Sequence, residues 1–411
     1  MKHPLARASV PLLLGVLGSC GPSALTPMSD SRARPSPADW AAAEAPYLTG
    51  HVQLTTRDRF LKAGEQYFSP DSNWIIFQAV PVPKPGEKPD PFYSMYVARL
   101  NRDAGGRVTG LQEPVRISAP GSANTCGWFH PTQPGVVLFG STLVPPTADR
   151  PPGYSRDRSR YEWEFPPETE VCVARLGADG RPMSPAAPIF SRPGYDAEAS
   201  WSKDGRFILY THVDPSDNDP NLWIYDSKSG AHTPLITAKG YDGGPFFSPD
   251  GKRICYRSDR RGDNLLQLYV ADLAFDDTSD PTRPTGIKAE HQITDNSDVN
   301  WCPFWHPSAK YLLYATSEIG HSNYEIFAVE ADATGAPETL RKARVTFASG
   351  FDGLPSFNAD GTMLIWCSQR GPRIEGEERP SSQIWLANLA GGTTPWDRAA
   401  AAGAATDAGS R

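Results

Sequence analysis

Residues 240–273, GYDGGPFFSPDGKRICYRSDRRGDNLLQLYVADL, contain the most informative pattern of the chain. An apolar run at 245–247 leads into a tight turn, Ser-Pro-Asp-Gly, at 248–251, and apolar residues then alternate with polar ones over 253–257 and 267–273. A Pro-Asp-Gly turn followed by period-two alternation is typical of antiparallel hairpins. This stretch therefore predicts consecutive antiparallel strands.

The unit recurs six times along the chain. Related turns occur as FSPD (68–71), FHP (129–131), WSKDG (201–205), WHP (305–307) and FNADG (357–361). The next strand recurs as WIIFQAV (74–80), VVLFGST (136–142), FILYTHV (207–213), RICYRS (253–258), YLLYATS (311–317) and MLIWCSQ (363–369). The strand after that ends as YVARL (96–100), CVARL (172–176), WIYDS (223–227), YVADL (269–273), FAVEA (327–331) and IWLANL (384–389). Such repeats of four strands predict an all-β, six-bladed β-propeller of four-stranded antiparallel blades, with insertions in its loops.

The outermost strands predict how the ring closes. Short apolar runs ending in Ser, Thr or Phe follow the first five repeats: VRIS (115–118), PIFS (188–191), PLIT (234–237), HQIT (291–294) and RVTF (344–347). Nothing comparable follows Leu389. We therefore expect residues 52–55 to complete the last blade, which removes the open sheet edge and gives a propeller over residues 51–390.

The turn, the Tyr-Asp or Gly that precedes it and the YVADL-like strand resemble the TolB-type (WD40-like) propeller repeat over about residues 52–389. This resemblance implies a bacterial envelope propeller with a protein partner. TolB has an α/β domain before its propeller, and the segment before residue 51 does not match one, so a role in the Tol–Pal system does not carry over. The same repeats form the gating propellers of prolyl-oligopeptidase-like peptidases, but no hydrolase domain is expected after Leu389.

Residues 1–20 have the pattern of a lipoprotein signal peptide. Lys2 and Arg7 flank an apolar core at 10–17 that is too short to span a bilayer, and the sequence Leu-Gly-Ser-Cys at 17–20 resembles a lipobox that would place a lipid on Cys20. The alternative is an ordinary secretory signal with a chance cysteine. We expect a periplasmic or outer-membrane location, a tether with a short helix over 21–50, and a disordered Ala-rich tail over 391–411. The net charge of −7 argues against nucleic acid as a partner.

Polar residues recur where the inner strands begin. Strands alternate in direction, so the loop before the first strand and the loop between the second and third share one face. Aligned positions are Ala63, Asn124, Asp196, Asp242, Asn300 and Asp352, and two residues later Glu65, Cys126, Glu198, Gly244, Cys302 and Leu354. We predict a ligand-binding channel mouth formed by Glu65, Asn124, Asp196, Glu198, Asp242, Asn300 and Asp352, able to bind a divalent cation or a cationic peptide group. The alternative is that each Asp or Asn caps its own turn.

Three insertions, 81–91, 143–169 and 370–380, are predicted on this same face. The second combines arginines with aromatic residues, which is typical of interface hot spots. We predict a partner-binding loop with Arg156, Arg158, Arg160, Tyr161 and Trp163. The alternative is a solvated loop whose aromatic residues pack on its own rim.

Catalytic motifs are absent from the sequence. There is no Gly-x-Ser-x-Gly, His-Glu-x-x-His or phosphate-binding glycine loop. His130 and His306 take the place of the turn serine and are expected to be turn residues. Cys126 and Cys302 align in facing blades, and Cys255 and Cys367 are aligned with each other in second strands. With Cys172 these leave an odd number of thiols beyond Cys20, so we expect buried free cysteines rather than a disulfide framework.

The sequence thus predicts a monomeric, non-catalytic envelope lipoprotein whose propeller binds a protein or peptide, without a cofactor. The alternative is a metal-dependent propeller lyase or hydrolase that uses Glu65, Asp196, Glu198, Asp242 and Asp352 as ligands or base. His212 is the nearest histidine to the predicted mouth, and it stands alone there.

Overall fold

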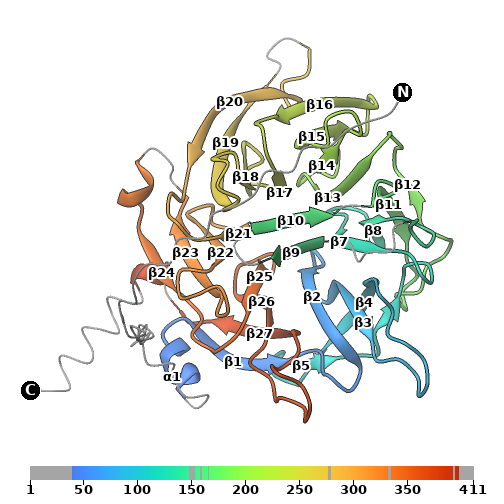
Figure 1. Ribbon diagram of the computed structural model, residues 1–411, viewed down its shortest axis with the longest axis vertical. Helices are drawn as coiled ribbons and strands as arrows, with labels where there is room; N and C mark the ends of the chain where they lie inside the picture. Colours follow the sequence, from blue (N-terminus) through green and yellow to red (C-terminus); the bar gives the residue numbers. More distant parts are fainter. Residues whose placement is uncertain are drawn as a thin grey trace, which may run out of the picture. The chain divides into compact units, whose positions relative to one another are not determined.

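The computed structural model describes residues 39–147, 166–275, 279–331, 335–391 and 394–397, together with the backbone of 153–157 and 160–164. Within this part, six antiparallel blade sheets are arranged as a propeller (Figure 1), five with four strands and one, blade one, with a short fifth strand. The inner strands contact one another in chain order, and the inner strand of the last blade contacts that of the first. The predicted six-bladed β-propeller is therefore confirmed.

The blades follow one another along the chain, each from its inner strand outward. Blade one has β2 (Phe60–Phe68), β3 (Trp74–Pro81), β4 (Ser94–Arg102) and β5 (Val108–Leu111), with β6 (Val115–Arg116) also on β4. Blade two has β7 (Asn124–Phe129), β8 (Val136–Ser141), β11 (Glu170–Arg175) and β12 (Ala187–Pro188). Blade three has β13 (Tyr195–Trp201), β14 (Phe207–Val213), β15 (Pro220–Asp226) and β16 (Ala231–Ile236).

The second half of the ring repeats the plan. Blade four has β17 (Asp242–Phe247), β18 (Arg253–Ser258), β19 (Gln267–Phe275) and β20 (Pro284–Gln292). Blade five has β21 (Asn300–Trp305), β22 (Tyr311–Thr316), β23 (Glu325–Glu330) and β24 (Lys342–Arg344), with the 3-10 turn η1 (Pro337–Thr339) before β24. Blade six has β25 (Asp352–Phe357), β26 (Met363–Ser368) and β27 (Gln383–Leu389).

The fourth strand of blade six comes from the other end of the propeller, as predicted. Strand β1 (Leu48–Gln53) pairs antiparallel with β27, with Leu48 opposite Leu389 and Val52 opposite Leu386. It follows the short helix α1 (Trp40–Glu44) and begins four residues before the predicted strand. The two ends of the propeller are thus joined within one sheet.

The turn between the first and second strands explains why the motif recurs. In blade four, Ser248 Oγ donates to Asp250 Oδ1 at 2.6 Å and accepts the Arg253 N–H at 3.0 Å. Blades one and three make the same pair of bonds. In blade two, His130 Nδ1 accepts the N–H groups of Thr132 and Gln133, so His130 is a turn residue as predicted. The side chain at this position closes the turn and fixes the start of the second strand.

The core lies between blades. One aromatic residue in each second strand has no exposed surface: Phe77, Phe139, Tyr210, Tyr256, Tyr314 and Trp366. In five blades this residue is directly opposite another aromatic ring of the third strand, an arrangement that stabilises antiparallel pairs: Phe77 with Tyr96, Tyr210 with Trp223, Tyr256 with Tyr269, Tyr314 with Phe327 and Trp366 with Trp385. The hydrophobic clusters join neighbouring blades, so each blade depends on the next.

Four inner-strand rings meet across the ring of blades. Tyr67, Trp128, Phe246 and Phe304 come from blades one, two, four and five, and their centroids are 4.8 to 6.0 Å apart. Blades one and four lie opposite each other, so the 5.8 Å contact of Tyr67 with Phe246 spans the centre. These four rings form an aromatic plug. At the same register in blades three and six, Ser200 and Ser356 donate to backbone carbonyls of Pro245 and Gln66.

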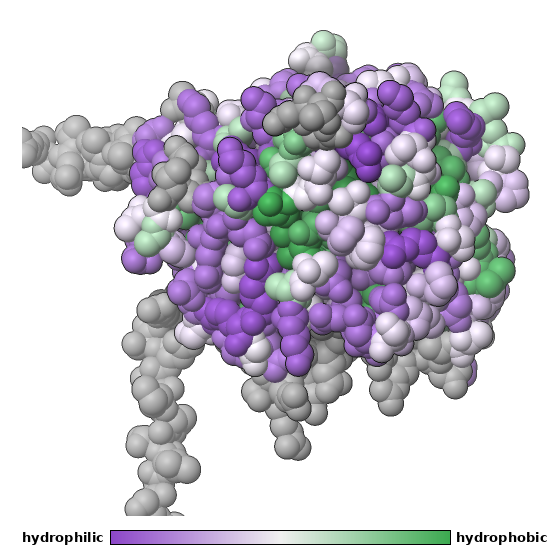
Figure 2. Space-filling model, turned by 90° about the horizontal axis from the view of Figure 1, so that it is seen from above, coloured by the Kyte–Doolittle hydropathy of each residue, from purple (hydrophilic) through white to green (hydrophobic). Residues whose placement is uncertain are grey.

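Figure 2 looks at one side of the molecule, where hydrophilic residues predominate and a strip of hydrophobic residues lies near the middle. Such a mixture is ordinary for a folded protein surface. No helix within the described residues has the length and apolar character needed to cross a membrane.

Candidate binding site at the channel mouth

A β-bulge at the start of every inner strand shapes the mouth. The register of all six inner strands shifts after their paired first residues. The first bulge residue has a positive φ, between 48° and 59°, in each blade: Glu65, Cys126, Glu198, Gly244, Cys302 and Leu354. Five of the six are not glycine, and each such backbone conformation costs about 1 to 3 kcal/mol. Bulges of this kind re-aim a side chain, and here they repeat around the channel.

Glu198, Arg257 and Tyr241 form a buried cluster at the floor of the mouth. Arg257 Nη2 donates to Glu198 Oε1 at 2.8 Å and to the Tyr241 hydroxyl at 2.7 Å. Glu198 also accepts the Gly244 N–H at 2.7 Å and the Thr211 hydroxyl at 2.8 Å. The Glu198 and Arg257 side chains are each 9% exposed. Glu198 is therefore a fully bonded, paired carboxylate.

Glycine at position 244 makes room for this arginine. A Cβ on Gly244 would lie 2.1 Å from Arg257 Nη1, closer than any real contact. The guanidinium thus occupies the space that a bulge side chain would take in blade four. Because Gly244 also has φ of +59°, two independent features require glycine here.

Glu65 is the second carboxyl group at the floor. Its Oε1 accepts the Cys126 thiol at 2.9 Å and its Oε2 accepts the Thr125 hydroxyl at 3.1 Å. Burial raises the pKa of Glu65, the negative charge of Glu198 raises it further, and the bond from Cys126 partly opposes both. Glu65 has no salt bridge with a cation among the described residues, unlike Glu198.

A cavity of about 610 Å³ lies above this floor. Glu65, Glu198 and Arg257 line it, with aromatic walls that include Tyr93, Trp301, Tyr324 and Phe351. Residues bordering all three long insertions also line it, among them Pro91, Pro166, Thr169 and Arg379. The insertions thus share the face of the inner-strand starts, as the alternation of strand directions predicts. The volume lies within the usual range for ligand pockets.

Of the seven predicted mouth residues, only Glu65, Asn124 and Glu198 line the cavity. Asp196, Asp242, Asn300 and Asp352 are 0 to 1% exposed and are held in separate contacts within the blades. Asn300 Nδ2 donates to Gln267 Oε1 and Asn296 Oδ1, and Asn124 Nδ2 donates to the carbonyls of Tyr93 and Ser122. Their bonds anchor the loops on either side of the strand, which is the alternative left open by the sequence.

The aspartates of this ring are bonded to neighbouring cations or histidine. Asp196 Oδ1 is 2.7 Å from His212 Nδ1, and Asp242 Oδ1 is 3.3 Å from Arg260 Nη2. Burial raises the pKa of Asp242 to about 7, although Ser258, Arg260 and the Ala238 N–H favour its ionised form. These side chains stabilise blades three and four and do not reach the cavity.

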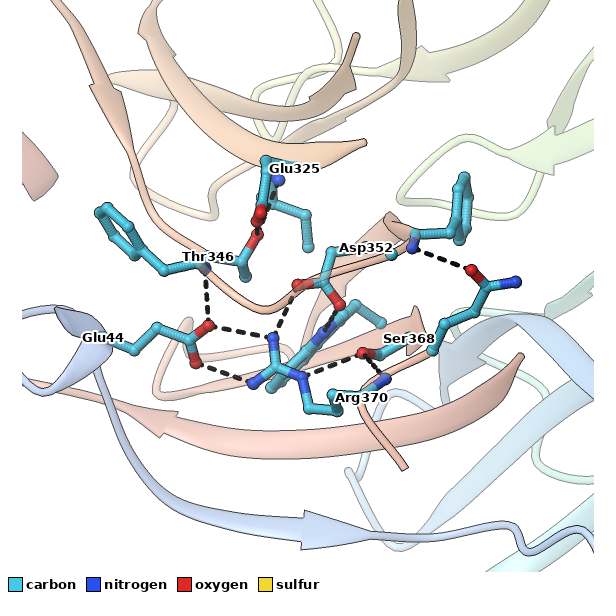
Figure 3. A network of polar contacts seen from close by, with 12 residues as sticks. Glu44, Glu325, Thr346, Asp352, Ser368 and Arg370 are labelled. Atoms are coloured by element: carbon cyan, nitrogen blue, oxygen red, sulfur yellow. Dashed lines mark hydrogen bonds and ion pairs between the residues drawn. The ribbon is translucent and has the colours of Figure 1, made fainter. Parts of the chain in front are cut away.

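Figure 3 shows the network around Asp352, which ties the N-terminal helix to the last blade. Arg370 donates to both carboxylate oxygens of Glu44, at 2.8 and 3.0 Å, and to Asp352 at 2.7 Å. Its guanidinium lies 4.4 Å from the Trp40 ring and 4.9 Å from the Trp366 ring. Glu44 also accepts the Phe347 N–H at 2.8 Å. Glu325 is nearby, and burial beside Asp352 raises its pKa.

The five carboxylates considered as metal ligands do not assemble. Within the described residues, no three His, Cys, Asp or Glu side chains are grouped so that they could hold a metal ion. Asp196 faces His212, Asp242 faces Arg260, Asp352 faces Arg370, and Glu198 faces Arg257. The donor set of the metal-dependent alternative does not fit this arrangement.

Several predicted residues fall outside what the structure describes. Cys20 and Arg158 are among them, as are the side chains of Arg156, Arg160, Tyr161 and Trp163. The backbone of the predicted partner-binding loop contains a two-stranded hairpin, β9 (Gly153–Asp157) and β10 (Arg160–Glu164), rather than a loop throughout. In Figure 1 this hairpin is drawn across the middle of the ring of blades.

Arg257 was not recognised from the sequence, although a signal exists. The equivalent residues of the other second strands are Gln78, Gly140, Thr211, Ala315 and Cys367, all uncharged. Arg257 is the one charged residue among these six equivalent positions, and this is visible once the strands are correctly aligned. The predicted equivalence of Cys255 and Cys367 is wrong, because Cys255 pairs with Phe246 and Cys367 with Gly353. The five described cysteines are buried and free.

No protein-family model and no curated protein matches this sequence. Similar solved structures include TolB from Acinetobacter baumannii, with 16% identity, a TM-score of 0.48, and coverage of 78% of this chain and 65% of that chain, less than two thirds of its length. A putative TolB from Agrobacterium tumefaciens has 15% identity and a TM-score of 0.46, covering 80% and 91%. An oligogalacturonate lyase in complex with manganese has 13% identity and a TM-score of 0.43, covering 82% and 92%.

Proposed function

We propose that this chain is a non-catalytic binding propeller of the bacterial cell envelope that docks a protein or peptide segment at the channel mouth. One observation carries the proposal: residues bordering three long insertions meet the inner-strand starts at a single cavity of about 610 Å³. Loops on a rigid scaffold are the usual place for binding residues. Aromatic walls supply contact area at low entropic cost.

The polar groups of the floor support binding more than catalysis. Glu198 accepts four donors, including Arg257, and is not available as a base. Glu65 has two possible nucleophiles in hydrogen-bond reach, the Thr125 hydroxyl and the Cys126 thiol, and burial raises the pKa of the thiol well above its usual range. The metal-dependent enzyme, the alternative from the sequence, has no group of three His, Cys, Asp or Glu side chains among the described residues that could hold its metal ion.

We further propose that a lipid on Cys20 holds the propeller at a membrane. The proposal is based on the apolar core and the Leu-Gly-Ser-Cys sequence of residues 1–20. Incorporation of labelled palmitate by the full chain, and its loss in Cys20→Ser, tests this step separately from binding. Retention of label in Cys20→Ser would contradict it.

Site-specific photo-crosslinking in the producing cells tests the docking role. A benzophenone amino acid placed at Tyr324 or Phe351, which line the cavity, should yield a discrete crosslinked protein. The matched position is Lys310, which lies in the turn between β21 and β22, at the opposite end of the inner strand from the mouth. Docking at this face would be contradicted if the partner crosslinks equally well to Lys310. It would also be contradicted if no protein crosslinks to either Tyr324 or Phe351.

A further inference from the structure

We propose that the mouth cavity selects an acidic segment of its partner, with a carboxylate received by Lys62, Arg379 and Arg257. This inference rests on the proposed binding function and names the chemistry of the ligand. It replaces the cationic group that the sequence favours for the same mouth.

Two cations line the cavity without a counter-ion. Within the described part of the chain, neither Lys62 nor Arg379 forms an ion pair, although both line the cavity. Lys62 Nζ lies 4.3 Å from the centre of the Tyr93 ring, and burial lowers the pKa of its ammonium group. Lys62 is exposed at its position in β2, so an incoming carboxylate can reach its ammonium group and form a charge-assisted hydrogen bond there.

The third donor lies at the floor. Arg257 lines the cavity with a side chain that is 9% exposed, and its Nε–H has no hydrogen-bond partner. A buried donor left unpaired destabilises the folded protein, so an acceptor supplied by a ligand would recover that loss. The Gln78 side chain lines the same cavity, but its unpaired atom is an acceptor and does not compete for the anion.

The carboxyl groups of the floor do not repel such a ligand strongly. The charge of Glu198 is balanced by Arg257. Glu65 has a raised pKa through burial, and its two oxygens already accept the Cys126 thiol and the Thr125 hydroxyl. Among the described residues that line the cavity, Lys62 and Arg379 are therefore the cations without an ionic partner.

The surroundings indicate a peptide of a larger partner rather than a small acid. Among the described residues four large hydrophobic side chains are exposed, and three of them lie in the three insertions: Val82 at 38%, Val144 at 61% and Ile374 at 43%. One exposed apolar residue needs no explanation, but one in each loop bordering the same cavity favours a partner that extends past the rim.

Selection from a phage library of random peptides tests the proposal on the purified protein. Peptides that bind the wild type and compete with one another for a single site should be enriched in Asp and Glu. Their affinity, measured by fluorescence anisotropy, should fall by about tenfold or more in a Lys62→Gln/Arg379→Gln variant. The matched control is Lys88→Gln/Arg373→Gln, which removes the same charges from two exposed residues outside the cavity, one in the first insertion and one in the third, and it should change affinity less than about twofold.

Each other outcome has a defined meaning. Selected peptides that are neutral or basic, or equal losses in both double variants, would overturn the acidic preference and leave the binding function standing. A library that yields no mouth-dependent peptide would refute the proposed binding function itself, and this inference with it. If glucuronate binds the wild type more tightly than the selected peptides do, the ligand is a small acid and not an acidic segment of a protein, and this inference is overturned.

Discussion

Arg257 Nη2 lies 2.8 Å from Glu198 Oε1, and this buried pair joins the second strand of blade four to the inner strand of blade three. Replacement by Arg257→Met should leave the Glu198 charge unpaired and lower the free energy of unfolding by about 3 to 5 kcal/mol. Urea denaturation followed by tryptophan fluorescence measures the loss. The double variant Arg257→Met/Glu198→Gln should recover part of it, because no charge is then left alone. Equal stability of the single and double variants would show that the pair is not coupled.

Glu44 closes the N-terminal helix onto blade six through Arg370, which has no exposed side-chain surface. We expect Glu44→Gln to lower the free energy of unfolding by about 2 to 4 kcal/mol, because it removes a charge from a buried ion network. Thermal denaturation measures the effect. Asp39→Asn, an exposed acid just before the same helix, should cost less than about 0.5 kcal/mol. A similar loss in both variants would contradict a specific role for Glu44.

Asp242 predicts a pH dependence of stability. Burial raises its pKa from the ordinary 3.8 to about 7, so the folded protein holds a proton that the unfolded chain releases. The contribution is fully present below about pH 4 and is lost as the pH rises to about 7. Asp242→Asn should therefore flatten the fall in the free energy of unfolding between these values, as measured by denaturation at several pH values.

Asp250 predicts a pH dependence of stability with the opposite sign to that of Asp242. Partial burial tends to raise its pKa, but the bonds from Ser248 and the Lys252 N–H outweigh burial and lower it. Its contribution is present at neutral pH and is lost as the pH falls through the acid range, so Asp250→Asn should lower stability at neutral pH and flatten the pH dependence in the acid range only. An Asp242→Asn protein whose stability still falls between pH 4 and 7 as in the wild type would refute the assignment.

Alanine variants at Gly244 and Gly251 distinguish the cost of steric conflict from the cost of backbone strain. Both have positive φ, +59° and +70°, but only a Cβ at Gly244 meets a neighbour, Arg257. Gly251→Ala should cost about 1 kcal/mol for the left-handed conformation alone. Gly244→Ala should cost about 2 kcal/mol more, because the added methyl displaces the guanidinium from Glu198. The difference between their urea midpoints measures this term, and equal midpoints would mean that Arg257 can move without loss.

The fold was open to prediction because the blade chemistry is local. The Ser248–Asp250 turn and the alternating strands after it recur with the same residue types, and the absence of a strand after Leu389 pointed to the N-terminal strand that closes the ring. The cavity was harder to predict. Asp196 and Asp242 are polar at the right position, but neighbours distant in sequence, His212 and Arg260, turn them into buried structural residues.

Backbone conformation explains why the other features of the cavity were not predicted. The bulge that aims Glu65 and Glu198 into the cavity has a positive φ at residues that rarely adopt one, and nothing in their type signals it. Arg257 reaches the floor only because Gly244 leaves space in the adjoining strand. Such contacts depend on the register between strands, and a two-residue slip in alignment, as with Cys255 and Cys367, hides them.

The aromatic plug of Tyr67, Trp128, Phe246 and Phe304 makes the mouth a blind cup rather than a tube. A partner then enters and leaves by the same opening and never has to be threaded through the ring. An internal bend of a long polypeptide can engage as readily as a free end, and release needs no cut or unfolding of what has been captured. Capture of this kind suits exchange between partners.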